Sequence, residues 1–156
     1  MKIDSRQQLI REVADALEMR LDEGCFYLNL TEQEVGLNLP TEYVDEENSW
    51  PHDGDEVIRI EPLSSHDAFD AMEEFADMQP QPISDKLYRA LGNRRPFNHF
   101  KETLGNIDLL DKWYAFKNEW YAKKAEEWLH EEEVDFSDGK IVCTGKTLTW
   151  IEDEDF

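Results

Sequence analysis

A short run of basic side chains surrounds Pro96 near the middle of the chain and comprises Arg94, Arg95, His99 and Lys101. Proline is favoured at the first position of a helix, so the two arginines are predicted to stand just before a helix N-terminus. The backbone N–H groups of such an end act together with guanidinium groups on an anion. We therefore predict that these four residues bind an anionic group or a partner. The alternative is that they pair with acidic side chains of the same fold.

Lys117 and Lys124 form a second unusual pair, because both fall within the apolar face of a long predicted helix. That helix spans residues 109–129, and its aromatic face covers about half of the cylinder at about 100° per residue. We favour the interpretation that the lysine stems lie between aromatic rings and that the ammonium groups make cation–π contacts. The alternative is that both lysines line the mouth of an incompletely covered face.

Two further patterns raise the question of a metal ion. Glu127 and His130 have the E-x-x-H spacing of carboxylate-bridged metal sites, which would need partners such as Asp70 or Glu73 from another helix. We favour a histidine that stabilises the helix C-terminus, where a positive imidazole suits the helix dipole. Residues 40–56 lack the D-x-[DN]-x-[DN]-G spacing of a calcium loop, so a solvated loop is predicted there. The acids of that loop are Asp45, Glu46, Glu47, Asp53, Asp55 and Glu56.

The chain of 156 residues carries a net charge of -21, which is unevenly distributed. Residues 86–124 hold nine basic and four acidic residues, a balance of +5, and the remainder holds seven basic and 33 acidic residues, a balance of -26. A surface with this much negative charge disfavours nonspecific binding to nucleic acid or to anionic membranes. The basic segment leaves a narrower RNA contact open, and its other interpretation is charge balance within the fold.

Other classes of protein are disfavoured by what the sequence lacks. The two cysteines, Cys25 and Cys143, make no zinc or CxxC spacing, and no apolar run approaches the ~18 residues of a membrane span. No signal-peptide pattern is present. A nucleophile elbow and a Gly-rich phosphate loop are also missing. We predict a soluble, cytoplasmic protein with no cofactor, no metal ion and no catalytic residues.

Hydrophobic periodicity predicts an α+β fold in one domain covering residues 1–156. A small, mostly antiparallel sheet is expected from a hairpin of residues 25–30 and 35–39 and a strand at 57–61, packed against several helices. Besides the long aromatic helix, helices are predicted at 5–21, from Ser64 or Ser65 to Met78, at 84–91 and at 97–104. The strand-like residues 140–144 and 146–150 around Gly145 are expected to join the sheet or to form a separate hairpin. The aromatic residues expected to be largely buried are Trp113, Phe116, Trp120 and Trp128.

Several of these aromatic residues agree in order and spacing with a family pattern, R-x-P/A-F-x-x-F-K/R followed by W-Y-x-F and a closing W-L. The matching positions are Arg95, Pro96, Phe97, Phe100 and Lys101, then Trp113, Tyr114 and Phe116, then Trp128 and Leu129. In these features the chain resembles uncharacterised protein family 0158 of the UPF series, found mainly in bacteria. The likeness covers about residues 5–130, so residues 1–133 are taken as a family-like core and 134–156 as a hairpin-like extension with an acidic tail. The resemblance implies a fold and no activity.

The leading functional hypothesis is a noncatalytic cytoplasmic binding or adaptor protein that recognises another protein, because an acidic surface with a local basic segment suits specific recognition. The alternative is a role related to nucleic acid, either as an RNA contact through residues 86–124 or as an acidic mimic of a nucleic-acid backbone. An enzyme is the least favoured class, since it would need a pocket around His99, Arg95 and a carboxylate.

Overall fold

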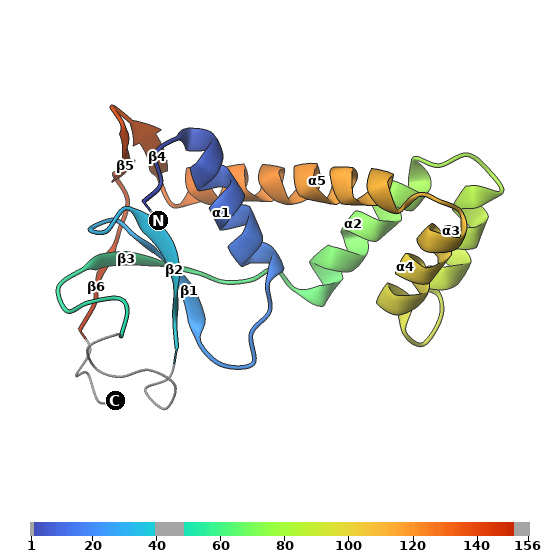
Figure 1. The fold of residues 1–156 in the computed structure, drawn as a ribbon, viewed down its shortest axis with the longest axis horizontal. Coiled ribbons are helices and arrows are strands. Elements are labelled where there is room, and N and C mark those ends of the chain that lie inside the picture. The colour runs from blue at the N-terminus through green and yellow to red at the C-terminus, as the bar shows by residue number, and fades with distance from the viewer. Residues whose placement is uncertain (1, 40–48, 152–156) are drawn as a thin grey trace. The chain divides into compact units, whose positions relative to one another are not determined.

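The computed structural model describes residues 2–39 and 49–151 and confirms the α+β class (Figure 1). Within those residues the chain forms five helices, a four-stranded sheet and a two-stranded sheet. The residues gather in two compact units. We call Met1–Pro62 together with Tyr121–Phe156 the sheet unit, and Leu63–Trp120 the helical unit. The count of one domain for residues 1–156 stays a prediction.

The four-stranded sheet is antiparallel throughout and has the strand order β2-β1-β3-β6. Its strands are β1 (Cys25–Asn29), β2 (Glu34–Asn38), β3 (Glu56–Ile60) and β6 (Leu148–Thr149). The predicted hairpin and the predicted third strand are therefore confirmed. Leu28 lies opposite Ile58 and both are buried, as alternation along paired strands requires for one core-facing side. Helix α1 (Arg6–Glu18) contacts β3.

Two tryptophans cover the side of the sheet that carries Tyr27. The Trp150 ring meets the Tyr27 ring edge-on at a centroid distance of 5.3 Å. Gly36, the register partner of Tyr27, lies under the Trp50 ring, and a Cβ atom there would stand 2.8 Å from Trp50 Cη2. The Trp50 indole N–H donates to Glu34 Oε1 at 3.1 Å. Glycine is thus required at position 36 by close approach of an aromatic ring.

Of the strand-like residues predicted around Gly145, one segment joins the main sheet and the other forms a separate hairpin with residues before it. β4 (Val134–Ser137) pairs with β5 (Lys140–Cys143), whereas β6 joins the main sheet beside β3. The turn between β4 and β5 uses Asp138 and Gly139, whose φ values of 54° and 78° suit a two-residue hairpin. At Gly145 a Cβ atom would lie 2.7 Å from the Glu132 carbonyl oxygen, so this glycine serves a close backbone approach.

The helical unit is organised around aromatic rings. Phe75 of α2 (Ser65–Asp77), Phe100 of α4 (Pro96–Asn106) and Trp113 of α5 (Leu110–Glu131) meet edge-on in pairs. Their centroids lie 5.1 to 6.4 Å apart, within the range that aromatic pairs prefer. α3 (Ile83–Leu91) adds the buried Leu87 and Leu91 to this core.

Helix α5 contributes to both units and buries different positions in its two halves. In the first half Trp113 is buried, with Phe116 and Trp120 half-buried beside it. In the second half the buried positions are Tyr121, Ala125 and Leu129. At about 100° per residue, the centres of these two sets lie roughly 150° apart around the helix. The wide predicted aromatic face therefore consists of two narrower stripes.

The prediction that four large aromatics are buried is right for Trp113, which is 2% exposed. Phe116, Trp120 and Trp128 are buried less completely, because they lie at the margins of the narrower stripes. Trp120 also has a polar reason to stay near solvent, since its indole N–H donates to Glu74 Oε2 at 2.6 Å. Across residues 2–39 and 49–151, no helix is long and apolar enough to cross a membrane.

Candidate functional site

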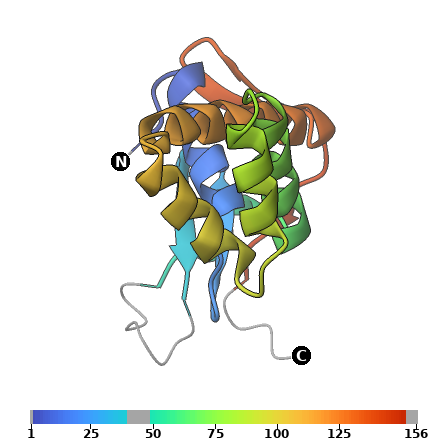
Figure 2. The ribbon, with the colours of Figure 1, turned by 90° about the vertical axis from the view of Figure 1, so that its right-hand side faces the viewer.

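A groove between α3 and α4 is lined by basic and neutral polar side chains. The two helices run side by side (Figure 2), and the groove has a volume of about 380 Å³. The α3 side supplies Lys86, Arg89, Ala90 and Asn93, and the α4 side supplies His99, Thr103, Asn106 and Ile107. Because none of these residues is acidic, the lining is positively charged.

Helical periodicity brings these side chains to one groove. Lys86, Arg89, Ala90 and Asn93 follow the spacing i, i+3, i+4, i+7, which repeats along one face of a helix. On α4, His99 and Thr103 stand one turn apart. The neighbouring faces of both helices carry the buried leucines and Phe100 of the aromatic core. The packing that closes the core thus also places the polar faces of α3 and α4 beside each other.

The basic side chains of the groove have no acidic partner within the part of the chain that the structure describes. No carboxylate oxygen there lies within 4.0 Å of the Lys86 ammonium or the Arg89 guanidinium. His99 makes no side-chain hydrogen bond or ion pair with any described residue. Asn93 Nδ2 donates to the Arg89 carbonyl oxygen at 3.1 Å, which holds the chain between the two helices. The two cations are therefore open to an anionic ligand.

The four basic residues predicted to act together around Pro96 do not share one site in the structure. Of its four residues only His99 lines the groove, and Arg94, Arg95 and Lys101 are exposed elsewhere. Lys101 follows His99 by two residues, and positions two apart on a helix do not share a face. Pro96 does begin α4, as predicted, and Arg95 takes the cap position without a side-chain hydrogen bond.

Sequence reasoning missed Lys86 and Arg89 as lining residues. Both were counted only within the basic segment of residues 86–124. The available signal was their i, i+3 spacing on a predicted helix whose next face carries Leu87 and Leu91. That spacing shows a shared face, but it does not show which other helix lies beside it.

The two lysines of the aromatic helix have separate environments. Lys117 Nζ lies 5.3 Å from the centroid of the Tyr114 ring, a cation–π geometry. Lys124 Nζ lies 3.6 Å from Glu127 Oε2, one turn further along α5. In each half of α5 the buried stripe excludes the lysine. Both lysines therefore stay near solvent, although they fall within the predicted aromatic arc. A mouth-lining role for the two lysines stays a prediction.

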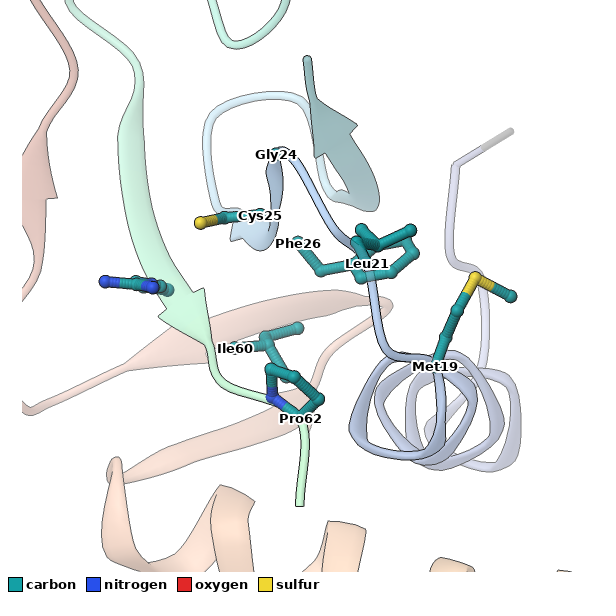
Figure 3. Close-up of a pocket in the computed structure, with 8 residues that line it drawn as sticks. Met19, Leu21, Gly24, Cys25, Phe26, Ile60 and Pro62 are labelled. Atoms are coloured by element: carbon teal, nitrogen blue, oxygen red, sulfur yellow. The ribbon is translucent and has the colours of Figure 1, made fainter. Parts of the chain in front are cut away.

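A small pocket lies at the end of β1 and β3 in the sheet unit (Figure 3). Leu21, Phe26, Ile60 and Pro62 form its wall, and its volume is about 130 Å³. Figure 3 shows the thiol of Cys25 pointing away from the Leu21 and Phe26 side chains. Successive strand residues point to opposite faces, so the thiol belongs to the other side of the sheet. The lining also includes Cys25 and Arg59, but among the described residues it has no carboxylate or imidazole that could activate the thiol.

The predicted E-x-x-H pair lies near the end of α5, where His130 stands in the last turn as expected for a capping role. His130 is exposed, and it lines a shallow pocket together with Lys123, Glu126, Glu127 and Glu131. Of the acidic loop, Asp45, Glu46 and Glu47 lie outside the described residues. Asp53 and Glu56 are exposed, whereas Asp55 is buried and hydrogen-bonded.

Comparison with known proteins places the chain in a family. An 80-residue stretch is 31% identical to the UPF0158 protein PA5073 of Pseudomonas aeruginosa, and it covers 50% of this chain and 52% of that relative. No solved structure matches the chain. The model of the family described as uncharacterised protein family UPF0158 matches residues 6–148, beyond the residues 5–130 that carry the resemblance in the sequence. The chain therefore belongs to the uncharacterised protein family UPF0158.

Proposed function

We propose that this protein is a noncatalytic binding protein of the cytoplasm that recognises an acidic segment of another protein through the groove between α3 and α4. The observation that supports this proposal is the pair of cations on one wall of the groove, Lys86 and Arg89, which have no acidic partner among the described residues. A guanidinium group binds a carboxylate through two parallel hydrogen bonds, which favours Asp and Glu side chains as ligands. Asn93, Thr103 and Asn106 add neutral hydrogen-bonding groups that orient a peptide.

Binding rather than catalysis is favoured by the surroundings of His99. A catalytic imidazole is held in one orientation by a hydrogen-bonded partner, usually a carboxylate. His99 has no such partner among the described residues. The groove therefore offers charge and hydrogen bonds to a ligand but no oriented general base.

A protein ligand is favoured over RNA because no aromatic side chain lines the groove. Single-stranded nucleic acid is usually held by stacking of its bases on aromatic rings. Tyr88 of α3 does not line the groove, and its phenol donates a hydrogen bond to the Asp77 carboxylate, which raises the pKa of Tyr88 to about 12. The net charge of -21 further opposes a long polyanion. RNA contact and nucleic-acid mimicry stay as alternatives.

The direct test compares two charge-reversal variants of the full chain. Lys86→Glu with Arg89→Glu alters the groove, and Arg94→Glu with Lys101→Glu makes the same charge change outside it. Binding of a fluorescent Glu-rich peptide and of a single-stranded RNA would be followed by anisotropy. We expect the groove variant to bind the peptide about tenfold more weakly or worse, because hydrogen bonds to charged groups contribute about 1.5–3 kcal/mol each. The control should change affinity less than about threefold, as exposed charges contribute about 0–1 kcal/mol.

The partner itself would be sought with a photo-cross-linking residue at Asn93 in native lysate, with and without nuclease. A protein adduct that survives nuclease and disappears in the groove variant would support the proposal. An adduct lost on nuclease treatment, with RNA affinity that depends on Lys86 and Arg89, would replace it by the RNA alternative. Equal peptide affinity in both variants would refute a role for the groove.

A further inference from the structure

Three potential metal ligands converge at one edge of the four-stranded sheet. His52 Nδ1 lies 3.8 Å from Glu32 Oε1 and 3.7 Å from Asp55 Oδ2. One ligand atom from each residue falls within 4.8 Å of the other two. Glu32 belongs to the turn between β1 and β2, and the other two residues precede β3. The group therefore combines two chain segments that pair in the sheet.

The buried side-chain amide of Asn29 makes hydrogen bonds to this group. Asn29 is fully buried at the end of β1. Its Nδ2 donates to Asp55 Oδ2 at 2.8 Å, and its Oδ1 accepts the backbone N–H of Glu32 at 2.9 Å. One side chain thus orients Asp55 and holds the turn that carries Glu32. Outer hydrogen bonds of this kind position the ligands of metal sites.

The loop that carries His52 and Asp55 is also held in place. Asp55 is 5% exposed, and its Oδ2 accepts the backbone N–H of His52 at 3.0 Å. Its own backbone N–H donates to the His52 carbonyl oxygen at 3.0 Å, and its carbonyl oxygen accepts from Trp150 at 2.7 Å. Gly54 permits the tight turn with a φ of +88°. Asp55 is therefore fixed, whereas the side chains of Glu32 and His52 are 40% and 59% exposed and free to adjust.

We propose that Glu32, His52 and Asp55 bind one divalent transition-metal ion, of the class of Zn²⁺, with water in its remaining positions. One imidazole nitrogen and two carboxylate oxygens suit such an ion, whereas Ca²⁺ takes six to eight oxygens. Tetrahedral zinc with bonds of about 2.0–2.1 Å separates its ligands by about 3.3 Å. Small rotations of the exposed Glu32 and His52 side chains would shorten the separations of 3.7 and 3.8 Å to that value.

The test is a titration of the chelator-treated full chain with Zn²⁺, followed by calorimetry. We expect one bound ion per chain, and affinity reduced about tenfold or more in His52→Gln and in Glu32→Gln. The control is His66→Gln, because His66 faces a single carboxylate, that of Asp70, at 3.8 Å. This variant should bind Zn²⁺ as the parent does. A Cys25→Ser, Cys143→Ser chain excludes binding through the two free thiols.

A second readout needs no variant. In the parent protein, Zn²⁺ should shift the ring proton resonances of His52 in NMR spectra and leave those of His66 unchanged. Co²⁺ should give the visible absorption of a low-coordinate site. Absence of binding, unchanged affinity in His52→Gln, or resonance shifts spread equally over all four histidines would overturn the proposal.

Discussion

The sheet unit and the helical unit differ both in their charge and in what holds them together. The sheet unit has nine basic and 27 acidic residues, a net charge of -18, and the helical unit has seven basic and ten acidic residues, a net charge of -3. The sheet unit buries the polar residues Asn29 and Asp55, whereas the core cluster of the helical unit is apolar and largely aromatic. Most of the net negative charge, -18 of -21, thus belongs to the sheet unit. The helical unit is closer to neutral, which lets the groove cations Lys86 and Arg89 of α3 attract an anionic ligand.

Trp113→Ala should have the largest effect, because it removes the buried ring around which Phe75 and Phe100 pack. We expect a loss of about 3–5 kcal/mol in the free energy of unfolding, measured by urea denaturation. Hydrogen exchange should show that peptides of α2 and α4 lose protection before those of β1 and β3. Trp113→Phe is the control, since it keeps a ring and removes an indole N–H that has no hydrogen-bond partner in the part of the chain that the structure describes. Equal loss of protection in both units would mean that they unfold together.

Asn29→Ala tests the hydrogen bonds by which Asn29 links Asp55 to Glu32 in the sheet unit, again by urea denaturation. The variant removes the Asn29 amide that donates to the buried Asp55 carboxylate and accepts the Glu32 backbone N–H. Asp55 keeps the hydrogen bond from the His52 backbone N–H, so we expect the cost of losing one hydrogen bond to a charged group, about 1.5–3 kcal/mol, in the free energy of unfolding. Asn98→Ala on the exposed side of α4 should change stability by less than about 0.5 kcal/mol. A loss below about 1 kcal/mol in Asn29→Ala would show that these hydrogen bonds contribute little to the stability of the sheet unit.

Gly36→Ala should have an intermediate effect on the sheet unit. The new methyl group would stand 2.8 Å from the Trp50 ring, whose indole N–H is bonded to Glu34, so the ring has to shift. Overpacking of this kind costs about 1–3 kcal/mol, which thermal unfolding would detect. Gly92→Ala in the helical unit is the matched change, because its new Cβ would meet atoms only at 3.6 Å and beyond. Similar losses in both variants would contradict the steric explanation.

Glu12→Gln should have the smallest effect and the opposite sign. Burial raises the pKa of the Glu12 carboxyl above 4.5, and the nearby Asp15 and Glu34 carboxylates raise it further. A raised folded-state pKa means that the ionised form destabilises the fold, so stability falls as the pH rises through that pKa. The variant should therefore melt at a slightly higher temperature at pH 7, with the difference vanishing well below pH 4.5. Glu23→Gln, at an exposed position, should show no such pH-dependent gain.

Much of the fold could be predicted because its signals are local. Ser64 and Asp67 form the capping box that begins α2, and Pro96 begins α4. The alternating apolar residues of β1 and β2 predicted their hairpin. In each case the stabilising contact lies within a few residues of the signal, so composition and spacing suffice.

The sequence by itself determined the α+β class, most helix and strand positions and the excess of acidic residues, because these depend on local spacing and on composition. Only the tertiary structure decided that α5 buries two different faces, that β6 joins β3, and that Lys86 and Arg89 share a groove with His99. It also brought Glu32 to His52 and Asp55 across the paired strands. Spacing predicts which residues share a face, but the partner of that face depends on long-range packing between segments distant in the chain.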